Sequence, residues 1–267
     1  MQKIKICSLY SGSKGNSVFI EAGGAKILID AGKSARVLCA SLRSIGVDID
    51  ELDAIFITHE HNDHVSALQT LSHKHNIPIH ILLSSAQVFN GLCDERLCLC
   101  LCLHDKNDFS VTIKGLTVQA FPTPHDSRAS VGYKLTFAGD GGEESSIAYA
   151  TDTGYISEAM LKNMLGAKYA VIECNHDLDM LRDGSYPFDL KARIASPRGH
   201  LSNVDCATLA THIALAGASH ILLAHLSEEN NLPDLAYSEV RGAVADDSVT
   251  IKVASQTDPV WLVGNEN

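Results

Sequence analysis

The sequence predicts a mixed α/β fold in which β-sheets are sandwiched between helices and one edge of the sheets carries polar, ligand-type residues. Two observations lead to this prediction. Residues 3–30 show the alternation and turn residues of a β-meander, and the chain then alternates between short apolar β segments and helical patterns. Several apolar segments end in His, Asp or Glu, so these side chains are expected to meet at one edge.

The individual elements follow from local signals in chain order. Gly23 and Gly24 close a hairpin, Ser34 and Ser202 suit the N-caps of helices, and Gly46 suits a helix end. Strands are expected over residues 3–10, 18–21, 26–30, 55–57, 78–82, 98–103, 109–113, 116–121, 129–137, 146–150, 169–172, 221–224 and 249–253. Helices are expected over residues 35–45, from the loop after 57 to near 76, and over 84–92, 187–194, 203–216 and 235–245.

The length of the chain is compatible with one large layered domain. It has 267 residues, 45% of them hydrophobic, and no proline-rich or glycine/serine linker divides it, so residues 1–267 are predicted to form a single domain. No signal peptide is visible at the N-terminus, and no apolar run approaches 18 residues. We therefore expect a cytoplasmic protein without a membrane span.

The eight cysteines are expected to remain thiols, since no secretory signal accompanies them. Cys98, Cys100 and Cys102 alternate with leucines, which would place three sulfurs on one face of a strand. A thiolate metal site usually needs C-x-x-C spacing, which is absent here. Packing is therefore preferred over metal or redox chemistry for these three residues.

The formal net charge of −11 argues against a protein that binds nucleic acid through a broad basic surface. Two divalent cations at a metal site would add four positive charges that this count omits. A phosphate-bearing substrate would therefore have to be attracted locally.

The densest group of potential ligands is H-x-H-x-D-H at residues 59–64, directly after an apolar run. His59 and His61 are two residues apart, so in extended chain they point the same way and can bind one ion. Asp63 and His64 lie where a helix begins and point elsewhere in the same pocket, so the spacing suits two metals. Imidazole and carboxylate ligands suit zinc, iron(II) or manganese. The alternative is a polar loop in which Asp63 caps a helix and the histidines are solvated.

Further ligand-type residues follow other apolar segments: His125, Asp152 and His225. Together with residues 59–64 they resemble the metallo-β-lactamase superfamily, nearly end to end. The resemblance implies a four-layer αββα sandwich of two mixed β-sheets with a dinuclear site. It also implies that His59, His61 and His125 hold one metal, that Asp63, His64 and His225 hold the other, and that Asp152 bridges them. Asp rather than Cys at the bridging position fits phosphodiesterase and other hydrolase branches.

Shorter motifs resemble one subgroup of that family, the YycJ/WalJ-like exonucleases. These motifs are S-G-S-K-G-N, T-P-H-D-S, T-D-T-G, E-C-N-H-D, G-H-L-S-N and A-H-L-S-E-E-N-N. The resemblance implies a DNA exonuclease acting 5′ to 3′, in which a metal-bridging hydroxide attacks the phosphodiester. No large inserted domain fits between Asp152 and His225, so the chain resembles a bare catalytic core.

The segment Gly199-His200-Leu201-Ser202 resembles a His-Ser/Thr segment ahead of a helix in tRNase Z-like relatives, which implies that His200 protonates the leaving oxygen or contacts the phosphate. A structural loop histidine is the alternative. Asp63 would accept a proton from the metal-bound water. Candidate substrate contacts come from three places. They are Ser13 and Asn16 in a loop resembling an anion nest, Asn175 and His176 after a strand, and the basic cluster Lys191, Arg193 and Arg198. Helix capping, or a solvated helix face, would explain the last two groups equally well.

Three functions follow. The first is a metal-dependent nuclease acting on DNA. The second is a hydrolase of small or cyclic phosphodiesters, favoured by the acidic charge and the missing binding domain. The third is a non-catalytic metal-binding regulatory protein. A basic groove leading to the metals would favour a polymer, and a closed acidic rim would favour a small molecule.

Overall fold

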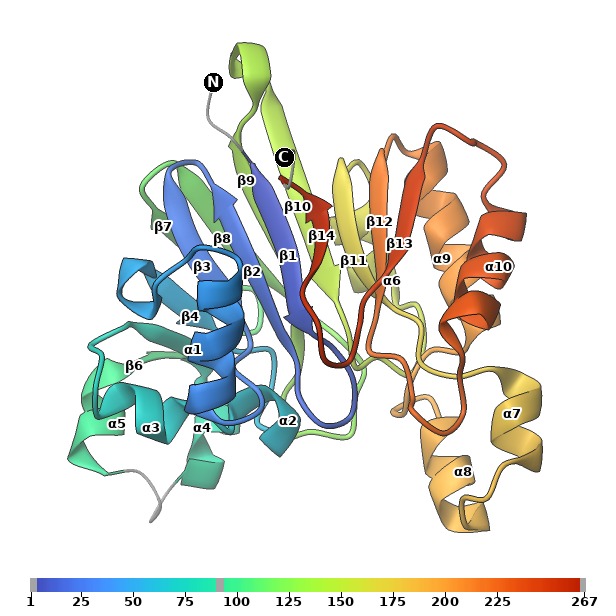
Figure 1. Ribbon diagram of the computed structural model, residues 1–267, viewed down its shortest axis with the longest axis horizontal. Coiled ribbons are helices and arrows are strands. Elements are labelled where there is room, and N and C mark those ends of the chain that lie inside the picture. The colour runs from blue at the N-terminus through green and yellow to red at the C-terminus, as the bar shows by residue number, and fades with distance from the viewer. Residues whose placement is uncertain (1–3, 90–93, 265–267) are drawn as a thin grey trace.

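The computed structural model describes residues 4–89 and 94–264. Two seven-stranded sheets pack face to face, and helices cover the outer face of each (Figure 1). This arrangement confirms the predicted four-layer αββα sandwich. No helix in these residues combines the length and apolar composition needed to cross a membrane.

The first sheet has the order β14-β1-β2-β3-β4-β5-β6. Its strands are β14 (Val260–Val263), β1 (Lys5–Tyr10), β2 (Ser17–Ala22), β3 (Ala25–Ile29), β4 (Ala54–Phe56), β5 (Ile79–Leu82) and β6 (Leu101–His104). Pairing is antiparallel from β14 to β3, where β1 to β3 form the predicted meander, and parallel from β3 to β6.

The second sheet has the order β13-β12-β11-β10-β9-β8-β7. Its strands are β13 (Thr250–Val253), β12 (His220–Ala224), β11 (Tyr169–Glu173), β10 (Glu144–Ala150), β9 (Val131–Ala138), β8 (Leu116–Pro122) and β7 (Ser110–Ile113). Pairing is antiparallel from β7 to β10 and parallel from β10 to β13. Both sheets are therefore mixed.

Three apolar clusters hold the layers together. The central cluster lies between the sheets and includes the fully buried Tyr133 and Tyr149. A second joins the first sheet to α1 (Ala35–Ser44), α3 (Leu68–Ser72) and α5 (Glu95–Cys100), and a third joins the second sheet to α6 (Glu158–Met164), α9 (Asn203–Leu215) and α10 (Pro233–Ala243). The short helices are α2 (Asn62–Val65), α4 (Leu83–Ala86), α7 (Leu178–Asp183), α8 (Phe188–Ile194) and the 3₁₀ turns Ile49–Glu51, Gln87–Phe89 and Asp140–Gly142.

The structure corrects several predicted elements. The strand expected over 98–103 begins as helix α5, because the Asp94 side chain caps it by accepting a hydrogen bond from the Leu97 N–H. Cys98 and Cys100 are therefore helical and only Cys102 is in a strand. Cys100 packs in the core as expected, but Cys98 is disulfide-bonded, so not all cysteines are thiols.

Other corrections concern element boundaries. The helix expected after residue 57 is broken into α2 and α3. Helix α6 and strand β14 had no prediction; β14 pairs with β1, the most distant partner in sequence. The helix expected over 84–92 ends as α4 and a 3₁₀ turn, and its last residues lie outside the described part of the chain.

Strand ends bring the polar residues to one edge of the sandwich. Asp30 follows β3, Asp152 follows β10 and His225 follows β12, and each has a left-handed backbone with φ of 63°, 54° and 57° respectively. For a residue with a Cβ this conformation costs about 1 kcal/mol or more. Side-chain hydrogen bonds hold Asp30 and His225 in this conformation. The backbone strain is therefore located where the strands end and the chain enters the site.

Candidate metal centre

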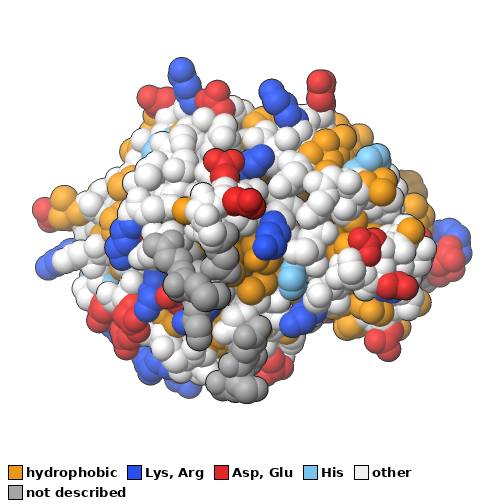
Figure 2. All heavy atoms as spheres, turned by 90° about the horizontal axis from the view of Figure 1, so that it is seen from above, with side chains coloured by type: hydrophobic (Ala, Val, Ile, Leu, Met, Phe, Trp, Pro, Cys, Tyr) orange, Lys and Arg blue, Asp and Glu red, His pale blue; other side chains and the backbone are white. Residues whose placement is uncertain are grey.

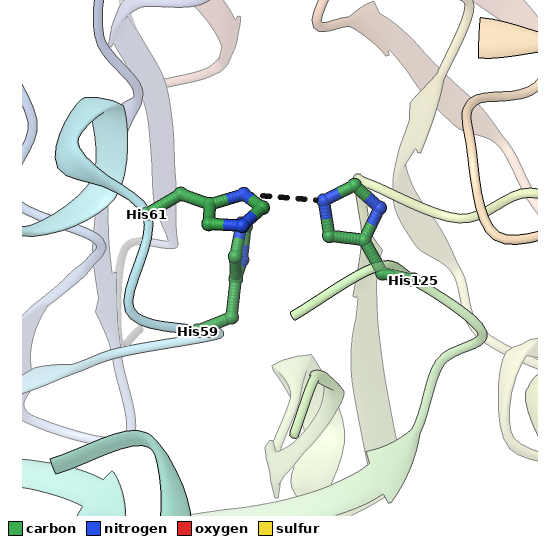
Figure 3. A group of neighbouring side chains, drawn as sticks. All are labelled: His59, His61 and His125. Carbon is green, nitrogen blue, oxygen red and sulfur yellow. Dashed lines mark hydrogen bonds between the residues drawn. The ribbon is translucent and has the colours of Figure 1, made fainter. Parts of the chain in front are cut away.

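The first cluster of ligand atoms consists of His59, His61 and His125 (Figure 3). His59 and His61 lie in the loop between β4 and α2, and His125 lies in the loop after β8. His125 Nε2 is 3.4 Å from His61 Nδ1, and the buried Nε2 of His59 has no hydrogen-bond partner in the described chain. One nitrogen from each ring lies within 4.8 Å of the others, which is compact enough for a single ion.

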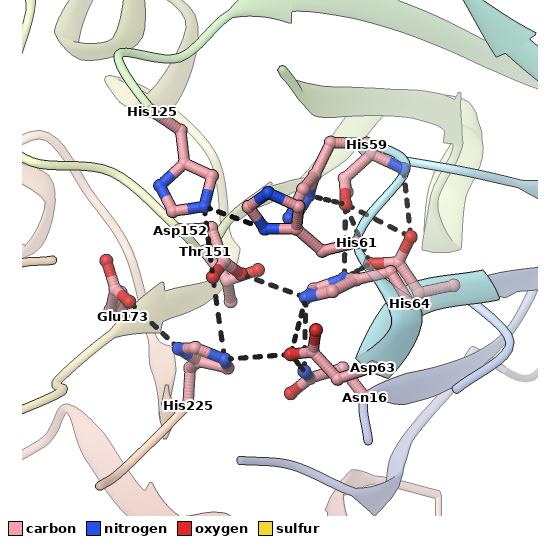
Figure 4. Close-up of polar contacts among 12 residues, drawn as sticks. Asn16, His59, His61, Asp63, His64, His125, Thr151, Asp152, Glu173 and His225 are labelled. Carbon is pink, nitrogen blue, oxygen red and sulfur yellow. Dashed lines mark hydrogen bonds and ion pairs between the residues drawn. The ribbon is translucent and has the colours of Figure 1, made fainter. Parts of the chain in front are cut away.

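The second cluster consists of Asp63, His64 and His225 (Figure 4). Asp63 and His64 lie in α2, and His225 lies directly after β12. Asp63 Oδ2 is 3.2 Å from His64 Nε2 and 3.6 Å from His225 Nε2. The start of α2 therefore places Asp63 and His64 beside His225, and the His64 ring also lies 4.1 Å from the His59 ring, so the two clusters adjoin.

Asp152 lies between the two clusters. Its Oδ2 is 3.3 Å from His64 Nε2, while its Oδ1 is 3.5 Å from His225 Nε2 and 3.8 Å from His125 Nε2. One carboxylate thus reaches residues of both clusters, as a bridging ligand must.

These distances fit metal ligation. Two ligands bound tetrahedrally at zinc–nitrogen distances near 2.0–2.1 Å lie about 3.3–3.4 Å apart. Moreover, His59 Nε2, Asp152 Oδ2 and His225 Nε2 are buried without a hydrogen-bond partner among the described residues. Buried polar atoms are normally paired, so a cation explains atoms that point at one another without bonding. The buried His and Asp clusters are consistent with a dinuclear metal site.

The opposite ring nitrogens are held by oxygens around the ligands. His64 Nδ1 donates to Asp30 Oδ2 at 2.8 Å, and His59 Nδ1 lies 3.0 Å from Thr58 Oγ1. Asp30 also accepts the Thr58 N–H at 2.8 Å, so it fixes the ligand loop to the end of β3. Such outer contacts set the tautomer and orientation of metal-binding histidines.

Glu173 plays the same part at the other side of the site. It is fully buried, and its Oε1 lies 3.0 Å from His225 Nδ1 and 2.7 Å from His200 Nδ1. Its Oε2 accepts the N–H groups of Thr153 at 2.8 Å and Leu201 at 3.2 Å. One carboxylate therefore receives four hydrogen bonds and joins three loops.

Sequence analysis missed Asp30, Thr58 and Glu173 as parts of the site. All three follow apolar strand segments, so the rule that identified Asp152 and His225 would have found them. They lie outside the HxHxDH motif and are not among the seven ligands that the family resemblance implies. The histidine partners of Asp30 and Glu173 are also distant in sequence, so only the folded chain brings them near.

The charge balance favours cation binding. Burial would raise the pKa of Asp152, but His225 and His64 outweigh it and hold the pKa well below its usual range. Burial opposes a charged His225, but Asp152, Asp63 and Glu173 outweigh it and raise its pKa to about 10. Ionised carboxylates are thus balanced by protons on histidines, and metal ions would replace those protons on binding.

Asp152 and four residues of the clusters, His61, Asp63, His125 and His225, line an open pocket of about 310 Å³, and His59 and His64 are buried behind it. Of the predicted substrate residues, Ser13, Asn175 and Arg193 line it, as does the predicted acid His200. His200 is 20% exposed at its side chain. Burial would lower its pKa, but Glu173 and Asp152 outweigh burial and raise it. Tyr186, Leu190 and Asp126 also line the pocket and were not predicted.

Other predicted substrate contacts have different surroundings. His176 is 2% exposed and is not among the residues that line the pocket, because the chain after β11 turns toward the start of α9, where the His176 carbonyl accepts the Asn203 N–H. The Lys191 ammonium donates to the carbonyls of Arg182 and Gly184, so it supports the end of α7. We correct the predictions for both residues: neither is placed to contact a phosphate in this pocket.

The S-G-S-K-G-N loop is a support for the ligands rather than an anion nest. Asn16 Nδ2 donates to Asp63 Oδ2 at 3.1 Å, and Asn16 Oδ1 accepts the Gly12 N–H at 2.9 Å. The N–H of Gly15 and the N–H of Asn16 bond to the Gly12 and Asp63 carbonyls. These inward bonds leave Asn16 buried beside Asp63.

Metal removal is expected to destabilise the protein. Binding to the folded state alone stabilises it by about 4 kcal/mol at a free metal concentration 1,000 times the Kd. Treatment with a chelator should therefore lower the midpoint of thermal unfolding, and added zinc or manganese should restore it. An unchanged midpoint in protein shown by metal analysis to be stripped would contradict a metal site here.

Fold and site together define a class: a metal-dependent hydrolase on an αββα sandwich. The sequence model of the β-lactamase superfamily domain matches residues 25–226. The exodeoxyribonuclease YycJ of Bacillus anthracis is 33% identical over 258 residues, covering 94% of each chain. The exodeoxyribonuclease WalJ of Streptococcus pneumoniae is 32% identical over 253 residues, covering 93% of this chain and 91% of the relative.

A solved structure agrees on the fold. The metallo-β-lactamase fold protein YhfI from Bacillus subtilis superposes with a TM-score of 0.72 at 18% identity, covering 97% of this chain and 99% of that one. The protein therefore belongs to the metallo-β-lactamase superfamily, and it is similar over nearly its whole length to relatives named exodeoxyribonucleases.

Proposed function

We propose that this protein is a dinuclear metal-dependent exodeoxyribonuclease that degrades DNA in the 5′ to 3′ direction. The observation that carries the proposal is full-length similarity to relatives named exodeoxyribonucleases, combined with clusters of His and Asp side chains at one pocket whose atoms could hold metal ions. The metals we propose are zinc, manganese or iron, which suit imidazole and carboxylate ligands. We expect the protein to act in the cytoplasm.

The side chains of the site suit phosphodiester hydrolysis. Two divalent cations, when bound, lower the pKa of a water molecule and offset charge on the phosphoryl and leaving oxygens. We assign His59, His61 and His125 to one cation, Asp63, His64 and His225 to the other, and Asp152 to both. In the described chain the side-chain contacts of Asp63 all go to Oδ2, which leaves Oδ1 to accept a proton.

His200 is assigned as the residue that protonates the leaving oxygen or contacts the phosphate. Its Nδ1 is held by Glu173, so Nε2 is the nitrogen available to substrate in the pocket that the ring lines. The same contact orients the ring and favours its protonated form.

A hydrolase of small phosphodiesters is the second candidate. The net charge of −11 disfavours a long polyanion, and a pocket of about 310 Å³ is at the lower end of the size range for small-molecule sites. On the face shown in Figure 2, the Lys and Arg side chains of the described residues are interspersed with Asp and Glu side chains, so these residues form no broad basic surface there.

One assay separates the two. Purified protein with manganese, iron or zinc is given single- and double-stranded DNA labelled at the 5′ or the 3′ end, RNA, and a chromogenic phosphodiester. Immediate release of a labelled mononucleotide from the 5′ end, with the 3′ label lost last, would support the proposal. Activity on the small ester alone would overturn it in favour of the second candidate.

The His200→Ala variant should lower kcat by roughly 10²- to 10⁴-fold, which is the usual contribution of a general acid. Metal content should stay at the wild-type value, because His200 is assigned to the substrate and not to a cation. Metal analysis and kcat on the same preparations test this. Loss of metal together with activity would contradict the assignment and make His200 part of the metal site.

A further inference from the structure

A second groove of about 450 Å³ lies beside the metal pocket and shares His125 with it. Its lining includes Pro124, Arg128, Tyr155, Pro197 and Arg198. None of these five residues lines the metal pocket. A chain that leaves the metal pocket past His125 would therefore enter this groove.

The groove is built from three loops that brace one another. They follow β8, follow β10 and precede α9. The Gly154 N–H donates to the Pro124 carbonyl at 2.8 Å, and a Cβ on Gly154 would lie only 2.3 Å from the Pro197 carbonyl carbon. Arg198 Nε donates to the His125 carbonyl at 3.2 Å. The groove wall is thus tied to the backbone of a metal-ligand residue.

The charges of the groove differ from those around the metal pocket. Arg193 pairs with Asp126, and Lys14 pairs with Glu228. By contrast, Arg128 and Arg198 are exposed, and in residues 4–89 and 94–264 neither guanidinium has a carboxylate oxygen within 4.0 Å. Two uncompensated guanidinium groups in one groove of a chain with a net charge of −11 favour a phosphate-bearing occupant.

Tyr155 adds an aromatic surface. Its side chain is 50% exposed, and the Tyr155 carbonyl accepts the Thr153 hydroxyl at 3.0 Å, next to Asp152. An exposed ring in a groove that also carries cationic groups is a usual binding surface for unpaired bases, because stacking needs a free base face. A duplex hides those faces, whereas a single strand presents them.

We infer that this groove binds the nucleotides next to the scissile phosphate of single-stranded DNA, with Arg128 and Arg198 on backbone phosphates and Tyr155 stacked on a base. The inference rests on the proposed nuclease function and deepens it. It makes a single strand, rather than a small phosphodiester or a duplex, the form that the site engages.

The test compares Tyr155→Ala, Tyr155→Phe and Arg128→Gln with the wild type on a single-stranded oligonucleotide and on bis(4-nitrophenyl) phosphate. The ratio of kcat/KM on the oligonucleotide to that on the small ester should fall about tenfold or more in Tyr155→Ala and recover in Tyr155→Phe, which keeps the stacking face. Arg128→Gln should lower the salt dependence of oligonucleotide binding by about 0.7 in log–log slope. Arg43→Gln, an exposed position near the end of α1, is the matched control.

Equal activity ratios and equal salt slopes in all variants would overturn the inference. So would preferential binding of duplex DNA by the wild type. If the proposed nuclease function itself is wrong, the wild type will not hydrolyse the oligonucleotide at all, and this result is distinct from the outcomes above. In that case fluorescence anisotropy of a labelled oligonucleotide decides about the groove: binding weakened by Tyr155→Ala supports it, and absent binding overturns it.

Discussion

Replacing Asp152 with Asn should lower kcat/KM by roughly 10³-fold or more on every phosphodiester, because we assign Asp152 to both cations and their stabilisation of charge would contribute several kcal/mol. Asp152 lies 3.3–3.8 Å from His64, His225 and His125, which belong to both clusters. A neutral amide would remove the negative charge of the carboxylate that we propose as the bridge between two cations. Metal analysis should show fewer than two metals per chain in the variant.

The matched control is Asp105→Asn, an exposed carboxylate between β6 and β7. It should leave activity and metal content unchanged. Circular dichroism should show that Asp152→Asn remains folded, since the substitution keeps the shape of the side chain. Full metal content with activity within tenfold of wild type would remove Asp152 from the bridging assignment.

Replacing Glu173 with Gln should weaken metal binding by roughly 10- to 100-fold and lower the free energy of unfolding by about 3 kcal/mol. Both carboxylate oxygens accept two hydrogen bonds each, from imidazoles on one side and backbone N–H groups on the other. Whichever way the amide is oriented, its NH₂ group faces two donors. Metal titration and chemical denaturation measure the two effects.

Glu239→Gln, on the exposed face of α10, is the control for the loss of a glutamate charge and should change neither quantity. The two effects can be separated by measuring stability in chelator, where metal binding no longer contributes. If Glu173→Gln binds metal as tightly as wild type, the proposed orienting role of Glu173 would be wrong.

Local sequence signals were sufficient for most strands and for the ligand loop. Residues 54–64 combine an apolar strand with HxHxDH, and a helix begins at Asn62 as expected, whereas His59 and His61 lie in the loop after β4 and not in the strand. The local sequence signals gave the wrong element where a segment suited both a strand and a helix. The alternation of Leu and Cys over 97–103 fits a strand, but the cap at Asp94 makes its first half helical.

The resemblance of seven residues to a known ligand pattern predicted the site, whereas its hydrogen-bonded surroundings depend on contacts between residues far apart in the sequence. Asp30 and His64 are 34 residues apart and Glu173 and His225 are 52 apart, and no periodicity links them. The same holds for Lys191: its sequence suggests a phosphate contact, but the fold gives it the carbonyls of Arg182 and Gly184.

The sequence by itself determined the order of most strands and helices, the choice of ligand-type residues and the acidic balance of the chain, because each depends on residue type and short spacing. Only the tertiary structure decided which carboxylates hold the histidines and that β14 joins the first sheet. It also decided that, among the described residues, the guanidinium groups of Arg128 and Arg198 have no carboxylate within 4.0 Å. These features depend on which strand ends meet at one edge, and that is set by packing of the two sheets around a common core.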